Sequence, residues 1–220
     1  MGLYIHGLLE NNLYENDMEH TINKLCSLLN KRLFITHNHI APPLPDDIEN
    51  YIVADLFYTE TINDEIKKEG DIWIDIYDED FSFDLIISKT GVLVGDFKFK
   101  WYFFDDYLKG DTWLKEYFEV HIEDIIQIGK LFNSKQLLLY PDELLEVPLE
   151  MKILEENHLI DNVLSTLKDY TIVSDKDIPL PEKDEIWIYR KNIETNSFTL
   201  NDWENYWANR KEPEIQYEDD

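Results

Sequence analysis

Apolar residues recur at two different spacings along this chain, and the change of spacing predicts where helices give way to strands. Between residues 17 and 33 they recur every three or four positions, which predicts a helix. The break APPLP at 41–45 ends this region, and Asp46 can cap a second helix. Ile52 and Leu56 continue the helical spacing, so we expect that helix to extend as far as Gly70.

From Gly70 the apolar spacing changes to two, which is the period of a strand. Residues 71–77 and 81–88 alternate in this way, and residues 92–104 form a third extended run rich in aromatic residues. Short turns at 78–80 and 89–91 separate the three runs. The sequence therefore predicts an antiparallel β-meander over about residues 71–104.

The rest of the chain predicts shorter elements. We expect a helix capped by Asp111 and running to Phe132, a buried strand at 136–140 and a helix over 148–168. Two short strands at 170–174 and 185–190 and a final helix carrying Trp203, Tyr206 and Trp207 would follow. No repeat or linker divides residues 1–220, so we expect a single α+β domain with the meander packed against helices.

Charge changes this picture more than any other compositional feature. The chain has 47 Asp and Glu against 20 Lys and Arg, a formal net charge of -27 over 220 residues. Residues 1–45, expected to be a helical N-terminal segment, are nearly neutral, whereas residues 212–220 form an acidic tail. Like charge destabilises a compact fold, so the surplus favours a basic protein partner. The acidity disfavours binding to nucleic acid or to anionic membranes, because proteins bind both mainly through Lys and Arg side chains.

The single cysteine, the first residues and the lack of a long apolar stretch predict a cytoplasmic protein, and we expect no cofactor. Cys26 is the single cysteine and lies on the apolar side of its predicted helix, so it is expected in the core. The first residues lack the features of a secretory signal, and no apolar stretch approaches the roughly 20 residues of a membrane helix. His37 and His39 could form part of a zinc site, but a surface turn is the simpler interpretation, and we expect no metal.

One pattern in the meander has catalytic chemistry. Asp84, followed after a turn by Asp96 and Lys98, is similar to the metal-dependent nuclease signature of the PD-(D/E)xK superfamily. A hairpin turning about Thr90 would place Asp84 opposite Asp96, where Mg²⁺ could relieve their repulsion. The resemblance implies a Mg²⁺-dependent nuclease as an alternative function. Phe83 stands where that family has a proline, and the acidity opposes nucleic-acid binding.

A second pattern interleaves aromatic residues with acids and suits the capture of a basic protein surface. Exposed Trp and Tyr would supply contact area, and the carboxylates would supply steering and charge-assisted pairs. The alternative is that the aromatic rings face the core and the acids merely solvate the outside. The predicted partner-binding residues are Trp73, Asp75, Tyr77, Asp78, Glu79, Asp80, Asp105, Asp106, Tyr107 and Asp111.

Size, acidity and the pattern of residues 71–146 resemble the immunity proteins of bacterial contact-dependent and polymorphic toxin systems. In that segment an aromatic meander precedes a helix and the stretch from Ser134 to Asp142. The resemblance implies a non-enzymatic, cytoplasmic inhibitor that covers the active site of a basic toxin, in particular a nuclease domain. A phage-type acidic mimic of nucleic acid, or a subunit whose acidity only aids solubility, remain alternatives.

Overall fold

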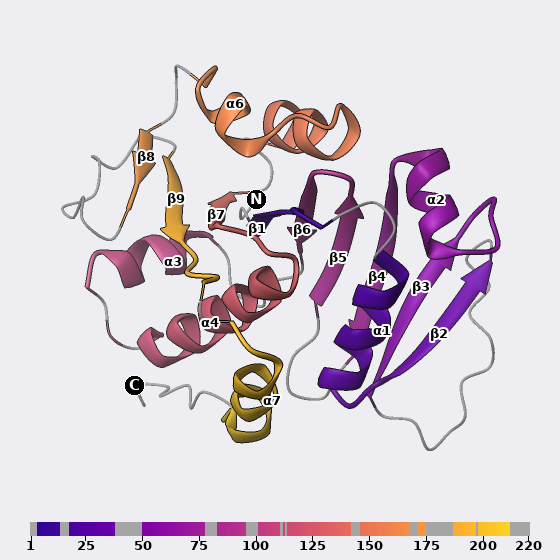
Figure 1. Cartoon of the computed structure of the whole chain (residues 1–220). Coiled ribbons are helices and arrows are strands. Elements are labelled where there is room, and N and C mark those ends of the chain that lie inside the picture. The colour runs from indigo at the N-terminus through magenta and orange to yellow at the C-terminus, as the bar shows by residue number, and fades with distance from the viewer. Residues whose placement is uncertain are drawn as a thin grey trace.

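The structure is a computed structural model of the 220-residue chain. It describes residues 4–13, 18–37, 50–77, 83–95, 101–110, 112, 114–141, 146–167, 171–174, 187–196 and 198–211. These residues form one α+β domain built on a nine-stranded, mostly antiparallel sheet (Figure 1). The strands are β1 (Ile5–Glu10), β2 (Arg32–His37), β3 (Tyr51–Leu56), β4 (Asp71–Tyr77), β5 (Phe83–Ser88), β6 (Gly91–Val94), β7 (Gln136–Pro141), β8 (Thr171–Val173) and β9 (Trp187–Asn192).

The order of strands across the sheet is β2-β3-β4-β5-β6-β1-β7-β9-β8. The meander β4-β5-β6 is antiparallel, whereas the outermost pair at each edge, β2 with β3 and β8 with β9, is parallel. The helices are α1 (Met18–Leu28), α2 (Ile62–Glu69), α3 (Trp101–Leu108), α4 (Lys115–Leu131), the π-helix η1 (Glu146–Glu155), α6 (Ile160–Leu164) and α7 (Leu200–Asn209).

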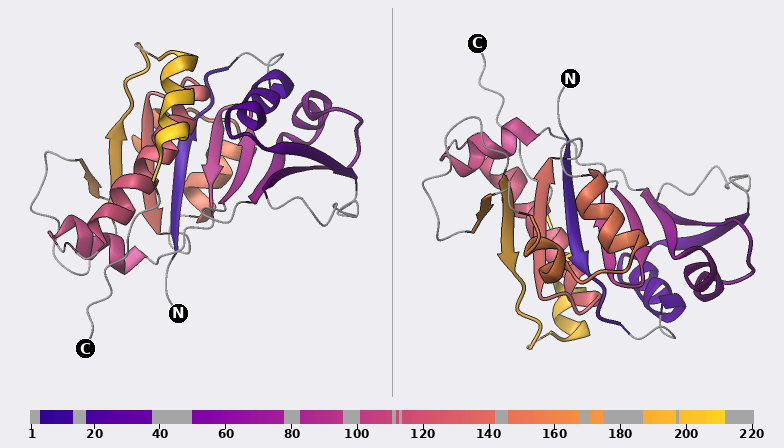
Figure 2. Two further views of the ribbon diagram at one scale, coloured as in Figure 1. Left: turned by 90° about the horizontal axis from the view of Figure 1, so that it is seen from below. Right: turned by 90° about the horizontal axis from the view of Figure 1, so that it is seen from above.

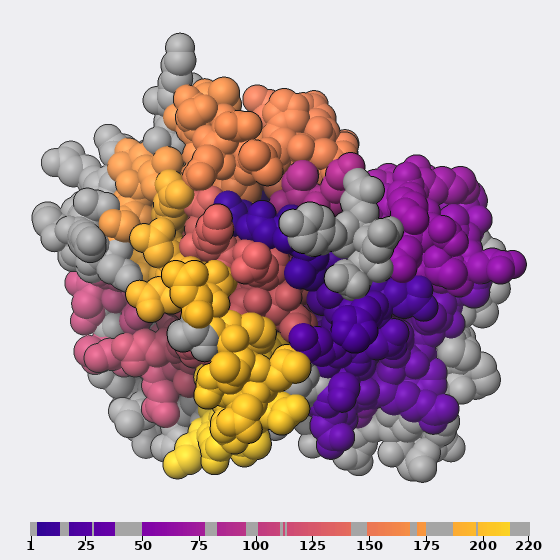
Figure 3. All heavy atoms as spheres, in the orientation of Figure 1, coloured from indigo at the N-terminus to yellow at the C-terminus, as the bar shows by residue number. Residues whose placement is uncertain are grey.

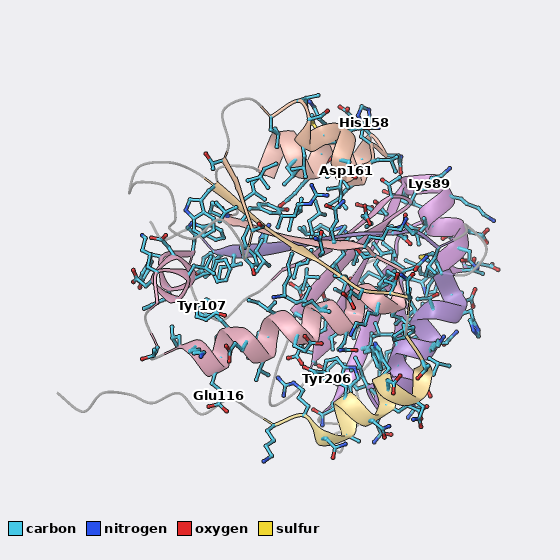
Figure 4. The ribbon with its side chains drawn as sticks, turned by 60° about the vertical axis from the view of Figure 1, so that its left-hand side comes forward. Lys89, Tyr107, Glu116, His158, Asp161 and Tyr206 are labelled. Atoms are coloured by element: carbon cyan, nitrogen blue, oxygen red, sulfur yellow. The ribbon has the colours of Figure 1, made fainter. Side chains whose placement is uncertain are left out.

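The helices form layers on the two faces of the sheet. One face packs against α1, α2, α3, α4 and α7 and holds the larger core cluster, whose buried residues come from eight strands, β1 and β3–β9. The other face packs against η1 and α6, and its smaller cluster draws strand residues from β6, β1, β7 and β9. Figures 2 and 4 show α6 on one side of the central strands and α4 on the other.

Local sequence explains where several helices begin and end. Thr61 caps α2 by accepting a hydrogen bond from the Asp64 N–H at 3.1 Å. Gly70 ends that helix with φ of 98°, a conformation that glycine adopts without steric cost. Thr199 caps α7 in the same way, through the N–H of Asp202 at 3.2 Å.

A buried polar cluster ties η1 to the centre of the sheet. The Tyr140 hydroxyl donates to Glu150 Oε1 at 2.7 Å, and His6 Nδ1 lies 2.7 Å from the same oxygen. Tyr140 is fully buried and Glu150 is 9% exposed. Buried polar groups need such partners, so the cluster fixes the position of η1 over β1 and β7.

The meander is confirmed over β4 and β5, but three expected elements are different. Residues 51–56 form strand β3 rather than the middle of a helix, and only Ile62–Glu69 is helical before Gly70. The third extended run ends at Val94, and Trp101–Leu108 is helix α3 instead of strand. The N-terminal segment is not simply helical, because it contributes β1 and β2 as well as α1.

The later elements follow the predicted order more closely. α4, β7, β8, β9 and α7 all occur near their expected positions. The helix expected over 148–168 is divided into η1 and α6, with Glu156 to Leu159 between them. Leu114 lies at the N-cap of α4, and the predicted cap, Asp111, lies outside the described residues.

Candidate partner-binding surface

Strand β4 presents a strictly alternating pair of faces. Ile72, Ile74 and Ile76 are at most 1% exposed and lie in the larger core cluster. Trp73 and Tyr77 lie on the opposite face and are 51% and 41% exposed. An indole left half in water on a sheet is an unusual use of a large apolar side chain, because its burial would stabilise the fold.

The face that carries Trp73 is left uncovered by the described helices at this end of the sheet. The core cluster beneath η1 and α6 includes no residue of β2, β3 or β4. We call this area the open face. It consists of Phe34, Tyr51, Asp55, Trp73, Asp75, Tyr77 and Asp84, which share one side of β2–β5 in the observed register. Arg32 and the buried Thr36 and Val53 lie on the same side, and Ile86 borders the open face where it packs against the cluster beneath η1 and α6.

Strand register sets the neighbours on the open face. Tyr51 is paired with Tyr77, and their rings stack with centroids 4.6 Å apart. Trp73 lies between Asp55 on β3 and Ile86 on β5. Asp75 is directly opposite Asp84. The carboxylate pair of Asp75 and Asp84 therefore lies near the middle of the open face. The stacked tyrosines lie on one side of the pair along β4, and the Trp73 indole lies on the other.

The paired carboxylates set the electrostatics of the open face. Like charges directly opposite each other on adjacent antiparallel strands destabilise a sheet. Burial, followed by the charges of Asp75 and Asp84 and by the neighbouring Tyr51 and Asp55, raises the pKa of the Tyr77 hydroxyl. A cation bound between the rings would relieve this repulsion, which favours Lys or Arg side chains as ligands.

Asp71, at the start of β4, makes the free energy of unfolding depend on pH in this acidic region. Burial and the charges of Glu155, Glu65 and Glu69 raise the pKa of Asp71 above its ordinary value of 3.8. The folded state thus holds the proton more tightly than the unfolded state, and the ionised carboxylate costs stability at neutral pH.

We expect Asp71→Asn to increase the free energy of unfolding near neutral pH by less than about 1 kcal/mol, because solvent screens a partly exposed group. The gain should vanish as the pH falls below the pKa of the unfolded state, since both forms are then uncharged. Urea unfolding at neutral and at acidic pH measures it, with the exposed Asp64→Asn as the control. A gain that persists in acid would contradict the assignment.

The other predicted partner-binding residues do not join the open face. Asp105, Asp106 and Tyr107 lie on α3, whose aromatic residues pack against Trp187 and Tyr189 of β9 near the other end of the sheet. Asp105 forms an ion pair with Lys109, and Asp106 is exposed. Figure 4 shows Tyr107 on α3, well away from the β5–β6 turn marked by Lys89. Asp78, Glu79, Asp80 and Asp111 lie outside the described residues.

The register of β5 and β6 differs by one residue from the one the nuclease motif needs. Leu85 pairs with Val94, and the Gly95 N–H donates to the Asp84 carbonyl at 2.9 Å. Asp84 is therefore level with Gly95 rather than Asp96, and its carboxylate is opposite Asp75. Asp96 and Lys98 lie outside the described residues, and no group of three or more metal-ligating side chains occurs among those described.

Two smaller predictions concern single residues. Cys26 is 5% exposed in the larger core cluster, which confirms its place in the core, and burial raises the pKa of its thiol to about 11. His37 is exposed at the end of β2, and His39 lies outside the described residues. No described helix combines the length and the apolar character needed to cross a bilayer.

Sequence reasoning missed two aromatic residues of the open face. Phe34 and Tyr51 lie on β2 and β3, and the Arg32 guanidinium lies 5.1 Å from the Phe34 ring centre. The missed signal was the β-favouring run Tyr51-Ile-Val, which a helix tolerates less well than a strand.

The sequence was compared with models of protein families, with curated proteins and with solved structures, and none of them matches it.

Proposed function

We propose that this protein is an acidic inhibitor of the immunity type that binds a basic protein through the open face. The observation that carries the proposal is the half-exposed Trp73 and Tyr77 beside the opposed carboxylates of Asp75 and Asp84. A fold gains nothing from exposing the rings or from facing the charges toward each other. Both features suit a ligand that brings cations and apolar stems together.

Inhibition on this proposal is occlusion. Lys and Arg side chains of the partner would form charge-assisted hydrogen bonds with Asp55, Asp75 and Asp84. The rings of Trp73 and Tyr77 would pack on their alkyl stems or on neighbouring apolar surface. A toxin nuclease domain fits as the partner class, because its substrate-binding residues must be cationic to hold phosphates. The net charge of -27 would speed the encounter, and salt would slow it.

Capture of the partner with matched variants tests the proposal. We expect immobilised wild-type protein to retain a basic protein from a lysate of the source cell at low salt. The double variant Trp73→Ala, Tyr77→Ala should bind it at least about 30-fold more weakly, the effect of losing about 2 kcal/mol at the centre of an interface. The variant Asp75→Asn, Asp84→Asn should also bind more weakly and show a smaller salt dependence.

Residues of α3 provide the controls. Tyr102 is 52% exposed, against 51% for Trp73, so Tyr102→Ala removes an equally exposed ring from another part of the molecule. Asp106→Asn is the matching charge control. The proposal is wrong if no basic protein is retained, if open-face variants retain as much as these controls, or if the retained protein stays fully active in the complex.

A further inference from the structure

The open face alone is small for a stable interface, which indicates that a partner contacts adjoining surface as well. Its strands are about 4.8 Å apart and rise about 3.3 Å per residue, so four strands of about six residues cover roughly 400 Å². A standard interface takes about 800 Å² from each partner. This step rests on the proposed function. The described surface that adjoins the open face on one side is the outer edge of β2.

Strand β2 is a long edge with few of the features that block pairing. It is the terminal strand in the sheet order, and among the described strands it pairs only with β3. Its sequence Arg32-Leu-Phe-Ile-Thr-His37 has no Pro, Lys, Asp or Glu, and the exposed Arg32 at its start is its one fully charged residue of the kind that natural sheets place on edges. Ile35 is 41% exposed at its centre. In contrast, β8 at the opposite edge has three residues.

Charge favours another protein over a second copy of this chain as the partner at the outer edge of β2. Two copies meeting edge to edge would each bring a formal net charge of -27. A basic chain is attracted to the acidic surface as a whole, and Asp55 on the adjacent strand β3, about 4.8 Å away, lies within a Debye length of β2. Strand addition gives affinity through main-chain hydrogen bonds and specificity through alternate side chains.

We propose that an extended segment of the basic partner adds to the outer edge of β2 as a further strand of the sheet. Alternate side chains of that segment continue the open face beyond Phe34, and the intervening ones lie beside Ile35. Main-chain pairing at the edge and side-chain capture on the open face then form one continuous interface.

A peptide of alternating lysine and valine is the probe, and backbone amide hydrogen exchange is the measurement. We expect the peptide at low salt to slow amide exchange in β2 of the wild-type protein. The same peptide N-methylated at every residue has no main-chain N–H on either edge, so it cannot form the main-chain ladder and should leave that exchange unchanged. Ile35→Lys places a guarding charge on the edge and should weaken binding about 10-fold, equivalent to 1.4 kcal/mol.

Ile172→Lys is the matched control. Ile172 is 38% exposed on β8, the other edge strand, and β8 pairs in parallel with its neighbour as β2 does. Both substitutions change the net charge equally, so general attraction of the peptide cancels. The inference is overturned if the peptide does not bind, if β2 amides are unaffected, or if Ile35→Lys and Ile172→Lys bind it equally. Should partner capture still depend on Trp73 and Tyr77, the proposed function stands and only the strand addition fails.

Discussion

Replacing Arg210 with alanine is expected to lower the free energy of unfolding by about 3–5 kcal/mol, the usual cost of leaving a buried charge without its partner. Arg210 follows α7 and forms a bidentate pair with Asp124 of α4, with Nε and a terminal nitrogen 2.9–3.0 Å from the carboxylate oxygens. The two side chains are 8% and 5% exposed. Tyr206 also donates to Asp124 at 2.6 Å, and its place on α7 below α4 is visible in Figure 4.

Thermal and urea unfolding measure this effect. For a chain of this size about 1 kcal/mol corresponds to roughly 2–4 °C in the melting temperature, so a loss near 10 °C is expected. Lys211→Ala is the control, because the neighbouring Lys211 is exposed and should change stability by less than about 0.5 kcal/mol. Arg210→Lys should recover only part of the loss, since an ammonium cannot reproduce the planar fork. Equal stability of Arg210→Ala and Lys211→Ala would refute the buried pair.

The same pair holds the C-terminal helix against the domain. Trp203 of α7 is fully buried and donates its indole N–H to the Gln127 carbonyl of α4 at 2.7 Å. Figure 3 shows α7 lying against the surface of the molecule beside α1, and contacts between the two helices agree with this view. Loss of Arg210 should therefore increase amide exchange first in α7.

Phe104→Ala is expected to cost about 3–5 kcal/mol, the range for removing a fully buried phenylalanine ring. Phe104 is 0% exposed, and its ring lies 5.3 Å from that of Phe118 and 5.6 Å from that of Tyr189. The substitution would leave a cavity where α3, α4 and β9 meet. Urea unfolding with an unchanged m-value would attribute the loss to the native packing.

The neighbouring Tyr102 makes this test specific for the helix. In a strand, Tyr102 and Phe104 would lie on the same face and Phe103 on the other, whereas in α3 Phe104 is buried and Tyr102 is 52% exposed. Tyr102→Ala should therefore change the free energy of unfolding by less than about 0.5 kcal/mol. Similar losses for both substitutions would indicate that residues 101–108 form a strand after all.

The elements that could be predicted are those with one buried and one exposed face. β4 alternates buried isoleucines with polar or exposed residues, so its period of two is visible in the sequence. The first half of α4 shows the helical period for the same reason, whereas residues 124–129 in its second half are all buried. β3 could not be predicted in this way, because Ile52 and Leu56 are four residues apart and satisfy a helical spacing while also sharing one face of a strand.

The sequence did not predict α3 and β1, and the physical reasons differ. The run Trp101-Tyr-Phe-Phe favours a strand by composition, but packing of Trp101 against Trp187 selects a helix, since tertiary contacts override weak propensities. β1 is buried on both faces, with Leu8 and Leu9 each at 0% exposure in different clusters, so its sequence does not alternate.

The residues of the candidate surface that lie on one strand could be predicted from the sequence. Those brought together by the pairing of different strands could not. The period of β4 alone places Trp73, Asp75 and Tyr77 together. The expected pairing of Asp84 with Asp96 depends on the exact turn, because a shift of one residue exchanges the two faces of a strand, and the structure places Asp84 level with Gly95. The contribution of Tyr51 required knowledge of β3, and the separation of Asp105 and Asp106 from β4 required knowledge of α3.

The position of β1 in the sheet determines the order in which the molecule can be assembled. β1 comes first among the described strands but lies between β6 and β7, so its two neighbours are made of residues 91–94 and 136–141. On a ribosome that adds about 5–20 residues per second, β1 waits several seconds or longer before either hydrogen-bonding edge finds its partner. Closure of the sheet is thus a late, long-range event of the kind that slows folding, and the near-neutral start of the chain is what stays exposed meanwhile.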